Sequence, residues 1–187
     1  GAENVAIGVQ ALDANTTGSN HVAVGNNALG ANTTGVQSTA CGDGALASNT
    51  TGNTNAAFGI GALDANTTGS DNTACGAYAL STATTASDNT GVGKFALFAT
   101  TTGNRNAAVG SLTLDANTTG ANNTGLGYAV LTVATTASNN TGLGHKALHL
   151  NTTGDENTAV GASALDANTT GANIVAVGMH ALGGNTT

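Results

Sequence analysis

Residues 154–170 read GDENTAVGASALDANTT, and the rest of the chain repeats this 17-residue pattern. The preceding copy, residues 137–153, reads ASNNTGLGHKALHLNTT, and the following copy, residues 171–187, reads GANIVAVGMHALGGNTT. Eleven copies account for all 187 residues with no insertion or deletion. A short fixed period is typical of proteins that stack one structural unit on the next. We therefore expect a single repeat array over residues 1–187, which we interpret as an excerpt of a longer fibre protein.

The composition narrows the class of protein. The chain has 28 Gly, no Pro and no Trp, and only 7% of its residues are charged. Such a composition also occurs in disordered tracts, but here the apolar residues recur in phase, which a disordered chain does not need. The net charge is −7, and the only bases are Lys94, Arg105 and Lys146. Because no basic stripe exists to displace phosphate counterions, a nucleic-acid partner is not expected. No apolar run is long enough for membrane insertion.

Each copy contains one short extended segment. In Asn157-Thr158-Ala159-Val160-Gly161, Thr158 and Val160 share one face of a strand and Ala159 points to the other. The residue equivalent to Val160 is apolar in every copy, which predicts that it faces the core. This set comprises Ile7, Val24, Cys41, Phe58, Cys75, Val92, Val109, Leu126, Leu143, Val160 and Val177.

The opposite face of the segment carries only Ala or Gly. A slot held to these two residues suggests that another backbone approaches closely, and we predict that it is a chain–chain interface. This small-residue column comprises Ala6, Ala23, Ala40, Ala57, Ala74, Gly91, Ala108, Gly125, Gly142, Ala159 and Ala176.

A leucine and a turn complete each copy. Leu165 has an equivalent leucine in all eleven copies, and this leucine column is predicted to form the second wall of the core.

A turn follows the leucine in each copy. Asn168-Thr169-Thr170 leads to Gly171, and these residue types are typical of a turn. The Thr-Thr pair is present in every copy, whereas the preceding Asn is replaced by Ala83, Thr100 and Ala134. Copies 6 and 9 also begin with Ala86 and Ala137 in place of Gly.

These features favour an all-β fold. A helix is disfavoured because Gly, Thr and Val are dense and no i, i+3, i+4, i+7 apolar stripe survives. We predict a parallel β-solenoid (a β-roll or β-helix) of eleven 17-residue coils, assembled side by side as a trimer or filament.

Cys41 and Cys75 would lie two coils apart, with roughly 9–10 Å between their Cα atoms, which is too far for a disulfide. We interpret both as small buried hydrophobic residues in the reduced form.

No motif for catalysis, cofactor or metal binding stands out. The Gly-x-Gly patterns arise from the repeat and lack the strand–loop–helix context of a phosphate site. His145 and His149 have metal spacing only on a helix, and Asp155-Glu156 is the only acidic pair. No nucleophile is accompanied by a base and an orienting acid. We expect no enzyme activity, no cofactor and no metal. The eight Asn-Thr-Thr sequences match the glycosylation signal, and we interpret them as turn residues.

The threonines raise an alternative function. Ice-binding solenoids display regular outward Thr ranks on a flat face. Here the two threonines of each copy are adjacent, so only one of each pair can face outward in an extended segment. A second outward rank would need Asn168 and its equivalents, together with Thr170. An ice-binding (antifreeze) β-solenoid that uses the Thr array therefore stays an alternative.

The extended segments resemble a known family. Asn4-Val5-Ala6-Ile7-Gly8, His21-Val22-Ala23-Val24-Gly25 and Asn157-Thr158-Ala159-Val160-Gly161 are similar to the head repeats of YadA-like trimeric autotransporter adhesins and to repeats in phage tail fibres. The resemblance covers about five residues in each copy, and the adhesin repeat is shorter, about 14 residues. It implies a β-roll of three chains packed side by side through small residues, in a rod for surface attachment.

The sequence thus predicts a structural and adhesive segment of an extracellular fibre on a cell or virion surface. Its expected partner is a copy of itself, in a homotrimer or a filament. A host-surface or matrix ligand would bind the variable outward residues Tyr78, Phe95, Phe98, Tyr128, Lys146 and His149. An architectural spacer whose outer residues bind nothing is the remaining alternative.

Overall fold

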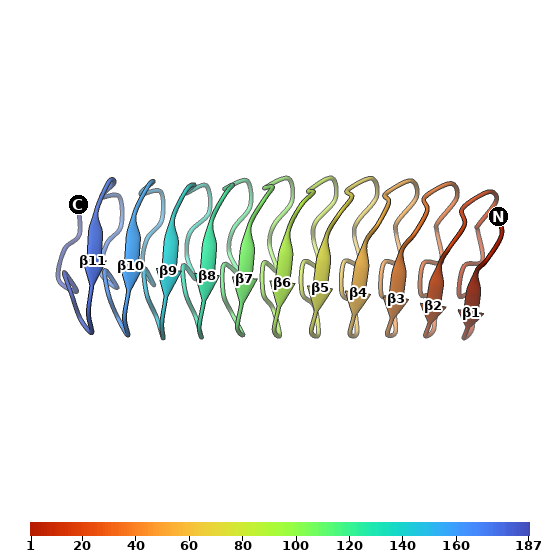
Figure 1. The fold of residues 1–187 in the computed structure, drawn as a ribbon, viewed down its shortest axis with the longest axis horizontal. Helices are drawn as coiled ribbons and strands as arrows, with labels where there is room; N and C mark the ends of the chain where they lie inside the picture. The colour runs from red at the N-terminus through yellow and green to blue at the C-terminus, as the bar shows by residue number, and fades with distance from the viewer.

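The computed structural model describes residues 1–187 as a parallel β-solenoid, in which each 17-residue copy forms one coil of a rod (Figure 1). Each coil carries one three-residue strand, and the chain forms no helix. The strands are β1 (Val5–Ile7), β2 (Val22–Val24), β3 (Thr39–Cys41), β4 (Ala56–Phe58), β5 (Thr73–Cys75), β6 (Thr90–Val92), β7 (Ala107–Val109), β8 (Thr124–Leu126), β9 (Thr141–Leu143), β10 (Thr158–Val160) and β11 (Val175–Val177). They form one sheet in chain order, so the predicted all-β solenoid with a 17-residue period is confirmed.

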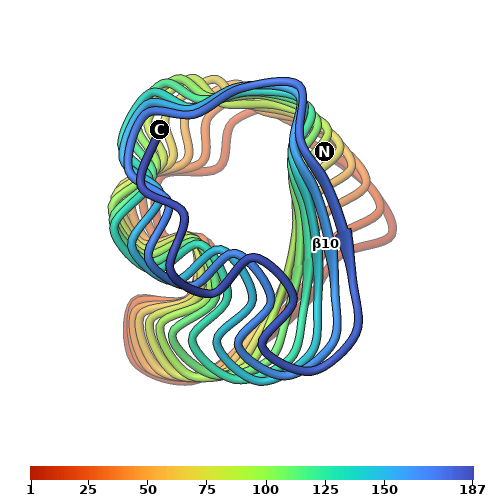
Figure 2. The same ribbon diagram turned by 90° about the vertical axis from the view of Figure 1, so that its left-hand side faces the viewer.

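The sheet register is set by the repeat. Every strand pairs in parallel with the strand 17 residues later, so that Val5 lies beside Val22 and Thr158 lies beside Val175. Equivalent residues therefore form continuous columns along the rod. An end view shows the coils superposed with a small progressive rotation, and the strands form one straight side of the cross-section (Figure 2).

Backbone hydrogen bonds join the coils around their whole circumference, not only at the strands. Of 122 backbone–backbone bonds, only 20 lie within the strands. The Leu12 N–H donates to the Ala28 carbonyl in the next coil at 3.0 Å, whereas the Gly25 N–H donates to the Ile7 carbonyl in the previous coil at 2.8 Å. Because each coil is bonded on both sides at several points, the stack behaves as a stiff one-dimensional array.

The core lies between the small-residue column and the leucine column. Ala57, Ala108 and Ala159 are fully buried within the single chain, as are Leu63, Leu114 and the other leucines away from the rod ends. The leucine column therefore forms one wall of the core, as predicted. The prediction for the strand faces is wrong: the small residues face inward, and Val160 and its equivalents face outward. We call this set, from Ile7 to Val177 in steps of 17 residues, the outer column.

The interface prediction for the small-residue column is corrected by the same observation. Apart from Ala6 in the first coil, its members are buried inside their own solenoid and leave no surface for a second chain. The physical reason is the narrow interior of the coil. A Cβ atom added to Gly91 would already lie 3.5 Å from the Leu80 side chain, so only Ala or Gly fits opposite the leucines.

The leucines adopt an unusual backbone conformation. All eleven have a positive φ, between 50° for Leu182 and 54° for Leu97. A left-handed residue of this type costs roughly 1–2 kcal/mol, and burying its side chain contributes roughly 1.5–3 kcal/mol. The buried side chain thus holds the chain in a tight turn that turns the backbone back toward the core.

Candidate functional surfaces

The residue directly before each strand forms the strand asparagine column: Asn4, His21, Ser38, Asn55, Asn72, Asn89, Asn106, Asn123, Asn140, Asn157 and Ile174. From Asn55 to Asn157 every asparagine is buried. Asn72 is typical. Its Nδ2 donates to the Ala86 carbonyl at 2.8 Å, and its Oδ1 accepts the backbone N–H of Asn89 at 3.1 Å. The column is an internal hydrogen-bond ladder, and its amides are fully used in structure.

His21 takes an asparagine's place in this column. Its imidazole is fully buried, with Nε2 2.7 Å from the Gly35 carbonyl and Nδ1 3.2 Å from the Ser38 N–H. The Ser38 N–H can only donate and the Gly35 carbonyl can only accept. His21 therefore fits as the neutral Nε2–H tautomer, in which Nδ1 replaces an asparagine oxygen and Nε2–H replaces an asparagine N–H. This histidine is a structural member of the ladder.

The residue before each Thr-Thr pair forms the turn asparagine column: Asn15, Asn32, Asn49, Asn66, Ala83, Thr100, Asn117, Ala134, Asn151, Asn168 and Asn185. Asn49 Nδ2 donates to Asn32 Oδ1 at 3.0 Å, and Asn66 Nδ2 donates to Asn49 Oδ1 at 2.8 Å. The ladder stops at Ala83 and Ala134, which leave the buried Oδ1 atoms of Asn66 and Asn117 without a hydrogen-bond partner. Thr100 keeps one link, since its Oγ1 accepts from Asn117 Nδ2 at 3.3 Å. Asn32, Asn66 and Asn168 are fully buried, so these Asn-Thr-Thr sites cannot carry a glycan in the folded rod.

The threonine column comprises the second threonine of each pair: Thr17, Thr34, Thr51, Thr68, Thr85, Thr102, Thr119, Thr136, Thr153, Thr170 and Thr187. All eleven are exposed. The first threonine of most pairs is less exposed, and its hydroxyl is engaged; Thr33 Oγ1 donates to the Thr50 carbonyl at 3.0 Å. One outward threonine per pair was predicted and is observed. The second outward rank expected from Asn168 and its equivalents is absent because these asparagines point inward.

The outward side of the sheet is the main exposed apolar surface of the rod. We call it the strand face: the outer column together with the first residue of each strand. Leu126 is 51% exposed, Phe58 is 44% exposed and Val109 is 38% exposed, all far from the rod ends. Cys41 and Cys75 are also exposed, which corrects their predicted burial. Sequence reasoning missed this surface because both sides of each strand carry apolar or small residues, so alternation alone does not distinguish inside from outside.

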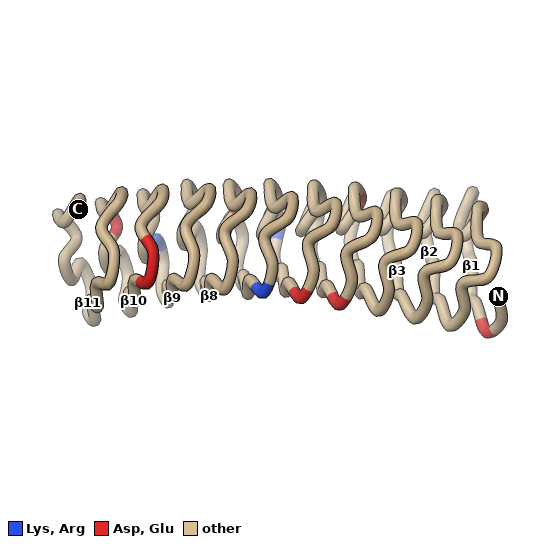
Figure 3. Tube along the Cα trace, turned by 90° about the horizontal axis from the view of Figure 1, so that it is seen from above, with Lys and Arg blue, Asp and Glu red and all other residues tan.

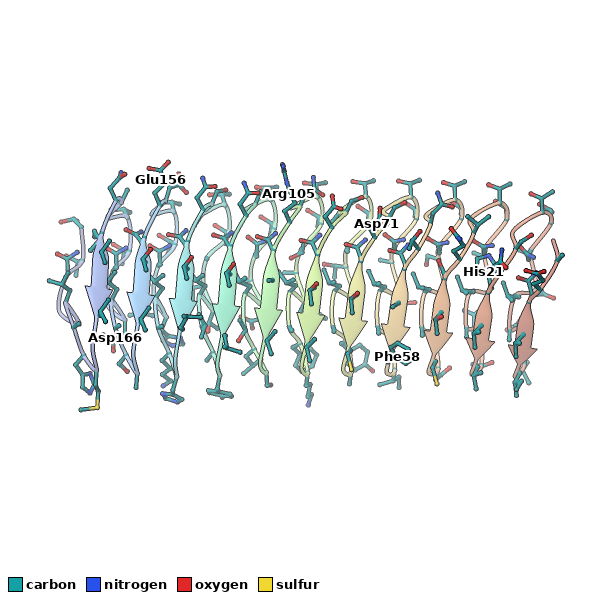
Figure 4. The ribbon with its side chains drawn as sticks, viewed as in Figure 1. His21, Phe58, Asp71, Arg105, Glu156 and Asp166 are labelled. Atoms are coloured by element: carbon teal, nitrogen blue, oxygen red, sulfur yellow. The ribbon has the colours of Figure 1, made fainter.

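Charged residues avoid the strand face. Asp71, Arg105 and Glu156 lie along the edge of the rod at which the strands begin, whereas Phe58 lies near the edge at which they end (Figure 4). Seen from above, charges of both signs are sparse along this edge (Figure 3). No three metal-ligating side chains come together, and no pocket is present. The structure also contains no helix with the length and apolar character of a membrane span.

Two carboxyl groups are perturbed by partial burial. Desolvation raises the pKa of Asp64 above its usual range. It also raises the pKa of Asp115, against smaller lowering effects from backbone N–H groups and from the charge of His149. One buried oxygen of Asp115 lacks a hydrogen-bond partner. His149 is held by its own contacts, with Nδ1 3.2 Å from both the Ala129 carbonyl and Thr132 Oγ1.

The predicted contact residues gather at the corner that follows the strands. Tyr78 stacks on Phe95 with ring centroids 5.6 Å apart, and Phe98 meets Phe95 edge-on at 5.3 Å. Lys94 Nζ lies 4.9 Å from the Phe95 ring centroid. In the neighbouring cluster Tyr128 stacks on His145 at 5.7 Å. Tyr78, Phe98 and Tyr128 are exposed, whereas Phe95, Lys146 and His149 are half-buried. The structure thus forms two aromatic clusters where the sequence predicted scattered outward residues.

Comparison of the chain with models of known protein families, with curated proteins and with solved structures finds no significant match.

Proposed function

We propose that this chain is a structural and adhesive segment of an extracellular fibre, a rod that projects from a cell or virion surface and assembles side by side with copies of itself. It carries out no catalysis. The observation that carries this proposal is the strand face, whose outer column is apolar in every coil and is exposed or half-buried along the whole rod. Soluble monomers rarely expose a continuous apolar surface of this size, and such surfaces mark association sites.

The dimensions of the strand face favour assembly. Eleven strands at parallel spacing span about 50 Å. Three extended residues span roughly 10 Å, so the strip covers on the order of 500 Å², which is more than half of the roughly 800 Å² per partner of a stable interface. Because the surface repeats once per coil, a second rod of the same period is complementary along its whole length. The partner that fits this face is therefore another copy of the chain.

The charge pattern supports the same partner. Two copies that each carry a net charge of −7 repel one another overall. The outer column contains only aliphatic, Phe and Cys residues, and the first strand residues are Val, Thr or Ala. The two strand faces therefore meet without burying a charge, whose desolvation would oppose association.

The two aromatic clusters around Phe95 and Tyr128 are the surface that we assign to attachment. They lie at the corner that follows the strands, outside the strand face, so assembly through the strand face leaves them accessible. Aromatic side chains provide large contact areas at low entropic cost, which suits a host-surface or matrix ligand. The resemblance of the strand segments to adhesin heads and tail fibres agrees with this role, with the strand face in place of the small residues as the contact between chains.

The test is the mass of the native particle in solution, measured under reducing conditions by light scattering and checked by electron microscopy. The proposal predicts bundled rods of two or more copies at micromolar concentration. A particle that stays monomeric at high concentration overturns it. Attachment of the assembled rods to host surfaces or matrix is then measured. Loss of attachment on alanine substitution of Phe95 and Tyr128 indicates an adhesive rod, and no loss indicates a spacer.

Ice binding is the second candidate, favoured by the unbroken exposed threonine column. The buried turn asparagines and the engaged first threonines leave this column as a single rank, so a flat two-rank array is not formed on that side. Thermal hysteresis and shaping of ice crystals by the purified rod test this candidate, and their absence removes it.

A further inference from the structure

The two cysteines occupy related places on the strand face. Cys41 ends β3 and Cys75 ends β5, and Phe58 of β4 pairs with both of them in the sheet. Both thiols are free and exposed. They are the only cysteines of the chain, and both lie in the outer column.

These thiols cannot bond to each other within one chain. They are separated by two strand spacings, roughly 9.6 Å between Cα atoms, whereas a disulfide needs a Cα–Cα distance below about 7 Å. The side chain of Phe58 also stands between them in the same column. Any disulfide that they form must therefore join different molecules.

We propose that Cys41 and Cys75 link neighbouring copies of the chain through intermolecular disulfides across the strand face. This inference rests on the proposed assembly, because the thiols of two rods meet only if their strand faces pack together. Side chains on two packed strand faces point toward one another, whereas Cys41 and Cys75 of one chain point the same way. A disulfide can join two packed sheets, as the inter-sheet disulfide of immunoglobulin domains does. The link converts a bundle held by apolar contact into a covalent one that only a reductant releases.

The chemistry balances with a low-molecular-weight disulfide as the oxidant. A thiolate of one rod attacks the small disulfide and forms a mixed disulfide, and one small thiol leaves. The facing thiol of the neighbouring rod then attacks this mixed disulfide, the protein–protein disulfide forms, and a second small thiol leaves. The two protein thiols are oxidised and lose two protons, and the small disulfide is reduced to two thiols.

The experiment follows cross-linking by oxidised glutathione on non-reducing gels, with the link identified by peptide mapping. The control is Thr68→Cys in a Cys41→Ser/Cys75→Ser background, which places one exposed thiol on the threonine column of the coil that contains Phe58. Because packed rods hold facing thiols at a high effective concentration, the native chain should cross-link about tenfold faster than this control. Mapped links between Cys41 and Cys75, or between like cysteines of two copies, support the proposal.

Equal rates for the native chain and the Thr68→Cys control would show random collision and overturn the inference, as would a native chain that stays free of cross-links. The mass of the Cys41→Ser/Cys75→Ser variant separates this result from the proposed function. If that variant still assembles, the rod assembly stands and only the disulfide link fails. If it is monomeric and the native chain is monomeric under reducing conditions, the assembly proposal fails as well.

Discussion

The side-chain oxygen Oδ1 of Asn66 lies 2.5 Å from the point where a Cβ atom on Gly69 would stand. The same relationship recurs between Asn49 and Gly52 at 2.5 Å. The carbonyl oxygen of Ala86 lies closer still, 2.1 Å from the same point on Gly69, so the asparagine oxygen and the backbone of the next coil together favour glycine three residues after the asparagine. In two coils both residues change together, to Ala83 with Ala86 and to Ala134 with Ala137. All four alanines are fully buried, so the coil accepts a methyl group in place of the glycine hydrogen where the asparagine amide is missing.

This coupling predicts the outcome of a double-mutant cycle. Ala83→Asn together with Ala86→Gly should restore the ladder, because the new amide can donate to the unpaired Oδ1 of Asn66. We expect the double variant to be more stable than the native chain by about 1 kcal/mol. Ala83→Asn alone should gain nothing or lose stability, since its amide meets the Ala86 methyl group. Denaturant unfolding of the four proteins should give a coupling energy of about 1–3 kcal/mol; additive effects would disprove the coupling.

The role of His21 predicts an asymmetric pair of substitutions. His21→Asn should leave the free energy of unfolding within about 1 kcal/mol of the native value, because an asparagine amide can serve both the Ser38 N–H and the Gly35 carbonyl. His21→Ala should cost about 2–5 kcal/mol, because it leaves both groups buried without a partner. Urea unfolding measures both variants. A similar loss for Asn and Ala would mean that the ring contributes by packing alone.

Asp64 predicts a pH dependence of stability. Its pKa is raised by burial, so the folded state binds this proton more tightly than the unfolded state. Stability should therefore fall as the pH rises from about 3.9, the ordinary aspartate value, through the raised pKa of the folded state. Below this window the cost is absent. Asp64→Asn should remove the cost at neutral pH and stabilise the rod by less than about 1 kcal/mol, since the carboxyl is only partly buried.

Unfolding measured between pH 3 and pH 7 checks this prediction. The difference between the native chain and Asp64→Asn should grow as the pH increases. A difference that stays constant with pH would assign the effect to hydrogen bonding of the new amide and not to titration.

The two sides of the strand predict opposite results for a single charge. Val109→Asp, on the strand face, should leave the fold intact but reduce assembly by about tenfold or more, because a buried unpaired charge opposes association. Ala108→Asp, in the small-residue column, should cost more than about 3 kcal/mol and disrupt the coil, since this site is fully buried. Thr119→Asp on the exposed threonine column is the matched control and should change neither. Native mass and circular dichroism distinguish these outcomes, and unchanged assembly of Val109→Asp would contradict the strand-face interface.

Several features of the rod could be predicted from the sequence alone. The period of 17 and the phase of the apolar residues determined a parallel solenoid, because only stacking of like residues in successive coils buries one small apolar group after another. The constant leucine marked one wall of the core, and the Thr-Thr pair that was predicted to lie in a turn forms a bend of the backbone in the first ten coils. The outward positions of Tyr78, Phe98 and Tyr128 followed from their variable slots, and their exposure agrees with that prediction.

The side of the strand that faces the core was decided by the tertiary structure. Both columns of the strand carry apolar or small residues, so the choice depends on the space opposite the leucines, which admits only Ala or Gly. In two coils even alanine does not fit: a Cβ atom on Gly142 would lie 2.5 Å from Val130 Cγ1, because Val130 is larger than the alanine found there in most coils. The pairing of Gly142 with Val130 depends on a distance across the interior of the closed coil. The same closure left the outer column exposed, and the assembly surface proposed for this protein results from it.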